Sequence, residues 1–331
     1  MAVVQTRIPA SDPKKVGIIG IGNVGRHVML TLVNQGIADE IVLIDLVDAK
    51  CRCEAMDINA GMAYMPNRVK VRAGTYEDLA DASVVVTSFG NMAITMSKGG
   101  NRLGELPYTI DAARKVGASL KACGFRGILI SITNPCDVIA HKLAEILGLP
   151  RGRVFGTGTG LDTARLLYRL SADSGVDERS ITAYMMGEHG AAIFAPLSIV
   201  SFNGIPLEAF ARENPKLRYD HESIGKAILG DAWTVAKSKH CTEHGIASTA
   251  ARMVKVVLND EKTIMPASAP LDGEYGERNV FAGVPCVLGK DGIERILELP
   301  LTPDEMATFR SCCESIRRNI ATAETFGEYK A

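Results

Sequence analysis

Three residues have the types and spacing needed to move a proton beside an anionic substrate. His189 lies between glycines in Gly187-Glu188-His189-Gly190, and the ordinary pKa of histidine suits proton transfer near neutral pH. Asp162 and Arg165 are three residues apart on a predicted helix, so they share one face. A carboxylate can fix the tautomer of a histidine, and an arginine can bind a planar carboxylate through two parallel hydrogen bonds. Taken singly, a surface histidine and an exposed ion pair are the simpler interpretations.

A glycine-rich loop near the N-terminus has the pattern that binds the pyrophosphate of a dinucleotide. It follows the apolar run Val16–Ile19 and reads Gly20-Ile21-Gly22-Asn23-Val24-Gly25. The first glycine permits a tight turn, the second lets the backbone approach the phosphates, and the third lets the next helix pack on the sheet. The predicted cofactor-binding residues of this loop are Gly20, Gly22, Asn23, Val24 and Gly25.

Asp45 indicates which dinucleotide is bound. It ends the second predicted strand, Ile41–Ile44, where an acidic side chain accepts hydrogen bonds from the ribose hydroxyls of NAD. The same carboxylate would repel the 2′-phosphate of NADP, so NAD is favoured as the cofactor. An ordinary turn residue is the alternative interpretation of Asp45. No G-x-x-x-x-G-K-[ST] sequence is present, so a nucleoside-triphosphate loop is not predicted.

The elements that must position these residues are predicted from short runs rich in β-branched residues. In the first half of the chain such runs alternate with stretches of helical periodicity, and they are Val16–Ile19, Ile41–Ile44, Val69–Val71, Val84–Val86, Ile128–Ile132 and Val154–Phe155. Continuously apolar strands separated by helices predict an α/β fold with a doubly wound (Rossmann) parallel sheet.

The second half has a mixed pattern, which predicts a C-terminal α+β substrate domain. It contains a predicted hairpin turn at Asn203-Gly204 and one long helical pattern from His221 to Asn259. We expect an NAD-binding domain at 13–157 and a catalytic domain at 158–331.

The composition excludes several classes of protein. Hydrophobic residues make up 47% and charged residues 23% of the 331 residues, as in an average soluble globular protein. The net charge of -1 argues against a nucleic-acid-binding surface. No run approaches the roughly 18 apolar residues of a membrane-spanning helix, and the N-terminus does not read as a secretory signal. We therefore expect a cytoplasmic protein whose eight cysteines are reduced thiols.

Four motifs, taken in this order, resemble the L-lactate and malate dehydrogenase family. They are the glycine loop, Thr133-Asn134-Pro135, Leu161-Asp162-Thr163-Ala164-Arg165 and Gly187-Glu188-His189-Gly190. The resemblance extends from about Lys15 to about Arg318 and also covers Val284–Gly289. It implies an NAD-dependent oxidoreductase that acts reversibly on the CH–OH group of L-2-hydroxy acids, assembled as a homodimer or homotetramer.

The resemblance implies a role for each matching residue. His189 would take the hydroxyl proton while hydride leaves for the nicotinamide, and Asp162 would orient it. Arg165 would bind the substrate carboxylate. Arg102 matches the mobile-loop arginine that polarises the substrate carbonyl, although a loop cation exposed to water is the alternative.

Two further positions match residues around the substrate in that family. Asn134 matches a residue near the substrate oxygen and the cofactor, although an Asn-Pro pair also favours an ordinary turn. Thr242 matches a position that lines the substrate pocket.

The loop that sets substrate specificity departs from both familiar patterns of the family. Residues 89–101 contain no arginine, which malate enzymes use for a second carboxylate. They also contain no glutamine, which lactate enzymes usually place there.

Apolar residues occupy this loop instead. Met92, Ile94 and Met96 offer flexible apolar surface, or they cover the underside of the loop. The run 100–106 resembles L-2-hydroxyisocaproate dehydrogenases. We therefore predict a 2-oxo acid with a bulky apolar side chain, such as 2-oxoisocaproate. L-Lactate dehydrogenase is the alternative, and malate dehydrogenase ranks below it.

Two other classes of protein stay open. A non-catalytic NAD-binding protein would keep the glycine loop and Asp45 without needing the catalytic set. A metal enzyme is suggested by the short stretch that holds His240, Cys241, Glu243 and His244. Because the H-E-x-x-H pattern is absent, we predict an exposed helix turn there and no metal site.

Overall fold

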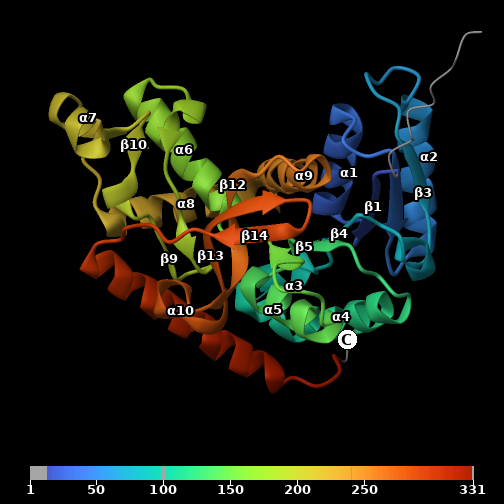
Figure 1. Ribbon diagram of the computed structural model, residues 1–331. Helices are drawn as coiled ribbons and strands as arrows, with labels where there is room; N and C mark the ends of the chain where they lie inside the picture. The colour runs from blue at the N-terminus through green and yellow to red at the C-terminus, as the bar shows by residue number, and fades with distance from the viewer. Residues whose placement is uncertain (1–12, 98–101, 240, 330–331) are drawn as a thin grey trace, which may run out of the picture.

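The N-terminal half forms a parallel sheet in the order β3-β2-β1-β4-β5-β6. Figure 1 shows this sheet in a computed structural model that describes residues 13–97, 102–239 and 241–329. The strands are β1 (Lys15–Ile19), β2 (Glu40–Ile44), β3 (Lys70–Ala73), β4 (Val84–Thr87), β5 (Ile128–Ser131) and β6 (Val154–Gly156). The strand order reverses between β1 and β4, which is the point where such sheets bind ligands.

Helices cover both faces of this sheet, which is why its strands are apolar on both sides. One face packs against α1 (Asn23–Gln35), α2 (Asp48–Gly61) and α9 (His244–Asn259). The other packs against α4 (Leu106–Ala122) and α5 (Cys136–Leu147). Neighbouring residues of one strand serve different faces, as Ile18 and Ile19 of β1 do. In Figure 1, α9 lies beside α1.

The C-terminal half extends the same sheet with antiparallel strands. These are β12 (Thr263–Asp272), β13 (Arg278–Gly289), β14 (Gly292–Ile296), β8 (Met186–Gly187) and β9 (Ile193–Phe194). Strand β12 pairs with β6 where Ser268 faces Gly156. The long helix α10 (Pro303–Glu324) packs on α5 and β13. The predicted fold class, a Rossmann sheet with a mixed C-terminal part, is confirmed.

A smaller sheet and three helices complete the C-terminal half. The sheet has the order β11-β10-β7, and its strands are β7 (Ile181–Thr182), β10 (Ser201–Phe202) and β11 (Ile205–Pro206). The helices are α6 (Gly160–Ser174), α7 (Leu207–Glu213) and α8 (His221–Lys239). The hairpin predicted at Asn203-Gly204 is confirmed, and both residues have positive φ angles, 49° and 89°.

The prediction of one continuous helix from His221 to Asn259 is wrong. Helix α8 ends at Lys239, and α9 begins at His244. In the break, the Cys241 Sγ accepts a hydrogen bond from Asn23 Nδ2 of α1 at 3.2 Å. Helical periodicity alone does not reveal a break that such a distant contact stabilises.

No helix within the described ranges combines the length and the apolar character of a membrane span.

Candidate active site

In the loop between β1 and α1, glycine stands at each of three positions for a different physical reason. Gly20 has a φ of +95°, and a Cβ there would lie 2.6 Å from the backbone nitrogen of Phe89. A Cβ on Gly25 would lie 2.1 Å from the carbonyl oxygen of Gly20. At Gly22 a Cβ would meet no atom within 4 Å. The loop is therefore packed behind Gly20 and Gly25 and open in front of Gly22, as a phosphate cradle requires.

The start of α1 offers donors to an anion. Gly22 is the N-cap and provides no side-chain hydrogen bond, so the first N–H groups of the helix lack a capping partner. Asp45 follows β2 and lies beside this loop, where its carboxylate accepts the N–H groups of Ile21 at 2.7 Å and Val47 at 3.1 Å. These residues fit a dinucleotide, with the pyrophosphate at the helix start and the ribose near Asp45.

His189, Asp162 and Arg165 come together in the structure. Asp162 and Arg165 lie at the start of α6, and His189 follows β8. One oxygen of the Asp162 carboxylate is 2.6 Å from His189 Nδ1, and the other is 2.9 Å from Arg165 Nη1. The side chains of Asp162, His189 and Arg165 are only 2%, 11% and 14% exposed. An exposed ion pair, the simpler interpretation, is therefore excluded.

The chemistry available to this group follows from its hydrogen bonds. With Nδ1 donating to Asp162, the imidazole presents Nε2 as the nitrogen that can exchange a proton. The buried carboxylate also stabilises the imidazolium that forms when Nε2 takes a proton, because charges interact more strongly away from water.

A second buried carboxylate, Asp137, holds the backbone of His189 and was missed by the sequence analysis. It accepts the His189 N–H at 2.8 Å and the Ser268 hydroxyl at 2.5 Å, and it is 2% exposed. Burial raises the pKa of Asp137 to about 7. The only signal in the sequence is its position three residues after Asn134, where an acidic residue in a first helical turn has an ordinary explanation in the helix dipole.

A cavity of about 340 Å³ extends from the glycine loop to His189, whereas Asp162 and Arg165 are not among the residues that line it. Its lining includes Asn23, Asn134, His189, Thr242 and Glu105. The Oδ1 atom of Asn134 is buried and has no hydrogen-bond partner among the described residues. An acceptor of this kind at a cavity wall suits a ligand that donates a hydrogen bond.

Glu105 is a further residue that the sequence analysis missed. It is 5% exposed, it accepts the backbone N–H of Asn91, and it lies against Gly90. It therefore places a carboxylate at the wall of the cavity beside the segment that follows β4.

Several predicted residues are not placed in this cavity. Arg102 begins a short 3-10 helix, Arg102–Glu105, and its side chain lies outside the described part of the structure. The side chains of Met92 and Met96, in α3 (Met92–Ser97), also lie outside it. Ile94 of the same helix is half-buried, and it does not line the cavity formed by the described residues.

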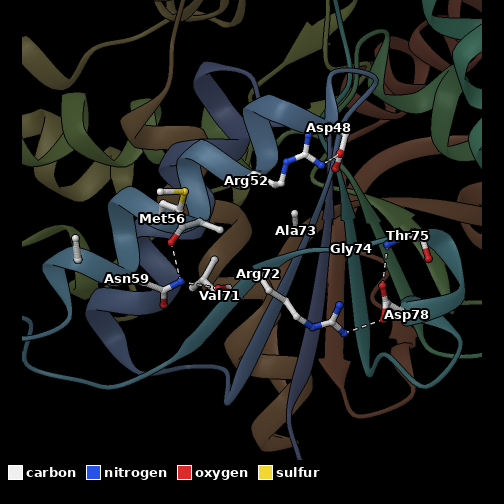
Figure 2. A pocket seen from close by; sticks show the side chains of 12 residues that line it. Asp48, Arg52, Met56, Asn59, Val71, Arg72, Ala73, Gly74, Thr75 and Asp78 are labelled. Atoms are coloured by element: carbon white, nitrogen blue, oxygen red, sulfur yellow. Dashed lines mark hydrogen bonds and ion pairs between the residues drawn. The ribbon is translucent and has the colours of Figure 1, made fainter.

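A larger open groove of about 1050 Å³ lies between α2 and β3 (Figure 2). Its polar side chains bind one another or the backbone: Arg52 contacts Asp48, and Arg72 donates to Asp78 at 2.9 Å. Asn59 donates to the carbonyl of Val71 at 2.7 Å. Among the described side chains, neither His189 nor Asp162 lines this groove, whereas His189 lines the smaller cavity, which is therefore the candidate active site.

Comparisons with known proteins identify the family. The NAD-binding domain of lactate/malate dehydrogenases matches residues 14–156, and their alpha/beta C-terminal domain matches residues 159–327. The chain belongs to the lactate/malate dehydrogenase family. It is an oxidoreductase whose cofactor is NAD.

Two similar proteins with curated names are L-lactate dehydrogenases. The chain is 36% identical to that of Fusobacterium nucleatum over 315 residues, which cover 95% of this chain and 98% of the relative. It is 39% identical to L-lactate dehydrogenase 1 of Bifidobacterium longum over 308 residues, or 92% of this chain and 96% of the relative.

Solved structures that resemble this chain also include lactate dehydrogenases. A lactate dehydrogenase from a Medee basin deep-sea metagenome library has a TM-score of 0.88 and 32% identity, covering 94% of this chain and 99% of that one. The minor L-lactate dehydrogenase of Enterococcus mundtii has a TM-score of 0.87 and 34% identity, covering 94% and 98%. The predicted closeness to L-2-hydroxyisocaproate dehydrogenases is not shown by these comparisons.

Proposed function

We propose that the protein is an NAD-dependent L-lactate dehydrogenase that reduces pyruvate and related 2-oxo monocarboxylic acids reversibly. The observation that carries the proposal is the buried His189–Asp162–Arg165 group beside a dinucleotide-binding loop. The names of the relatives support lactate as the substrate.

The composition of residues 89–101 favours a monocarboxylic acid as the substrate. Residues 89–101 contain no arginine to bind a second carboxylate. Oxaloacetate and malate are therefore disfavoured as substrates.

In the proposed reaction, Arg165 binds the substrate carboxylate and so fixes the position of the neighbouring carbonyl. NADH supplies the hydride to the carbonyl carbon when bound. His189 Nε2 donates the proton that the carbonyl oxygen takes up, and Asp162 stabilises the imidazolium before that transfer. Arg102 polarises the carbonyl, Asn134 lies next to the reacting oxygen and the cofactor, and Thr242 lines the pocket.

A bulky 2-oxo acid such as 2-oxoisocaproate is the second candidate substrate. The absence of glutamine from residues 89–101 favours it, together with Met92, Ile94 and Met96 in the same loop. Each additional buried methylene contributes about 0.8 kcal/mol, so a few of them would favour the bulky acid by one to two powers of ten.

A kcat/KM series with NADH tests the proposal, using pyruvate, 2-oxoisocaproate, phenylpyruvate and oxaloacetate. We expect pyruvate to give the highest value and oxaloacetate the lowest. A value for 2-oxoisocaproate about ten times that of pyruvate would establish the second candidate. Highest efficiency with oxaloacetate would refute the monocarboxylate assignment.

We further propose a cytoplasmic homodimer or homotetramer in which residues 13–157 bind the cofactor and residues 158–331 complete the substrate site. The eight cysteines are all free thiols, which supports a reducing compartment. Sedimentation analysis tests the assembly, and a monomer at micromolar concentration would contradict it.

A further inference from the structure

Two histidines and a glutamate meet at the junction of α1 and α9. His27 lies in α1, and Glu243 and His244 lie at the start of α9. One possible ligand atom from each residue lies within 4.8 Å of the other two. The rings of His27 and His244 are edge to face, with centroids 4.8 Å apart. The stretch around Glu243 offered no convincing metal site by itself, and the structure adds His27 from a distant part of the chain.

The distances suit one shared ion. Three atoms no more than 4.8 Å apart all lie within about 2.8 Å of a common point. Zinc bonds to imidazole nitrogen and carboxylate oxygen are about 2.0–2.2 Å long, so each ligand atom needs to move by less than about 1 Å. Imidazole and carboxylate together are ligands that Zn²⁺ accepts readily.

Two neighbours prepare these side chains to bind a cation. His27 Nδ1 lies 2.7 Å from the carbonyl oxygen of Asn23 and 3.8 Å from the Glu243 carboxylate, and the contact with Asn23 orients the ring beside Glu243. Lys239 donates to the Glu243 carboxylate at 2.7 Å, so this carboxylate already binds a cationic group. The lysine is 42% exposed, and an ion pair of this kind is weak enough for a metal ion to replace it.

Glu243 is also linked to the wall of the active-site cavity. The Cys241 thiol donates to its carboxylate at 3.4 Å and accepts Asn23 Nδ2 at 3.2 Å. Cys241, Thr242 and Asn23 line the cavity. An ion held by Glu243 therefore acts on residues next to the cofactor loop.

We propose that His27, Glu243 and His244 form an inhibitory site for Zn²⁺, separate from the catalytic residues. Bound Zn²⁺ displaces Lys239 and draws the Glu243 carboxylate away from Cys241. This shifts the segment 241–243 against Asn23 and weakens cofactor binding. The binding of the ion does not depend on the proposed substrate, whereas its inhibitory effect rests on the proposed dehydrogenase activity.

Equilibrium dialysis with Zn²⁺ after treatment with a chelator tests the binding. The variants are His27→Gln and His244→Gln, and His221→Gln is the matched control, because His221 is 52% exposed and lies 3.9 Å from a single glutamate, Glu305. We expect one Zn²⁺ per wild-type chain, at least about ten-fold weaker binding in the two variants, and no change in the control. Absence of binding, or equal binding in all four proteins, would overturn the site.

Steady-state kinetics tests the inhibition. We expect Zn²⁺ to raise the KM for NADH several-fold in wild type and in H221Q, with reversal by a chelator. H27Q and H244Q keep their basal activity and lose this response. If Zn²⁺ inhibits these two variants as strongly as the wild type, the inhibitory role is refuted, whatever the substrate proves to be.

Discussion

The Asp162→Asn variant tests the central geometric argument. The substitution keeps the size of the side chain and removes the charge that lies 2.6 Å from His189 Nδ1 and 2.9 Å from Arg165 Nη1. A hydrogen bond to a charged group is worth about 1.5–3 kcal/mol, and about 1.4 kcal/mol corresponds to a factor of ten in rate. Because the imidazolium loses its buried counter-charge, kcat for pyruvate reduction should fall at least about 10- to 100-fold.

The assay follows NADH absorbance, and NADH fluorescence measures cofactor binding separately. Since Asp162 does not belong to the glycine loop, we expect NADH affinity to change by less than about two-fold. Asp231→Asn is the matched control, because Asp231 pairs with Arg169 at 2.8 Å but is 48% exposed. A kcat for Asp162→Asn within two-fold of this control would refute the reasoning, provided that circular dichroism shows both variants folded.

Three further predictions follow from the same site. His189→Asn should abolish turnover, by about 10²-fold or more, while NADH binding measured by fluorescence stays within two-fold, and retained turnover would exclude His189 as the proton donor. Gly22→Ala should weaken NADH binding about ten-fold without lowering the unfolding temperature, because its Cβ points into open space, whereas Gly25→Ala should lower that temperature, because its Cβ would lie 2.1 Å from the Gly20 oxygen. Burial raises the pKa of Asp137 to about 7, above the ordinary value of about 3.9 in an unfolded chain, so the folded protein binds more protons in this interval and its free energy of unfolding should fall as pH rises from about 4 to about 7. Urea denaturation at both ends of that range should show a smaller fall for Asp137→Asn than for wild type, and equal falls would contradict the assignment.

Local patterns predicted most of the fold. The alternation of apolar runs and helical stretches is a property of neighbouring residues, and it predicted the strands from β1 to β6. The spacing of the glycines before Asp45 is also a property of residues close in the sequence, and it predicted the glycine loop between β1 and α1. The break between α8 and α9 could not be predicted, because the contact of Cys241 with Asn23 joins residues far apart in the sequence.

The site was predictable where a motif carries its own chemistry. His189, Asp162 and Arg165 lie together as expected. Asp137 and Glu105 were missed, because their importance comes from burial against His189 and Asn91 and not from their sequence neighbours. The roles proposed for these residues stay predictions, as do those of Arg102, Met92 and Met96.

The pairing of β6 with β12 restricts how this enzyme can open. One sheet continues from the NAD-binding domain into the C-terminal domain, and the two meet where Ser268 of β12 pairs with Gly156 of β6. Asp137 of α5 strengthens the contact between the two domains, because it accepts hydrogen bonds from the Ser268 hydroxyl and the backbone N–H of His189. A hinge motion of one domain against the other would have to break the β6–β12 pairing and these hydrogen bonds. We therefore expect ligands to enter and leave through local rearrangements at the edge of the cavity, while His189 keeps its position.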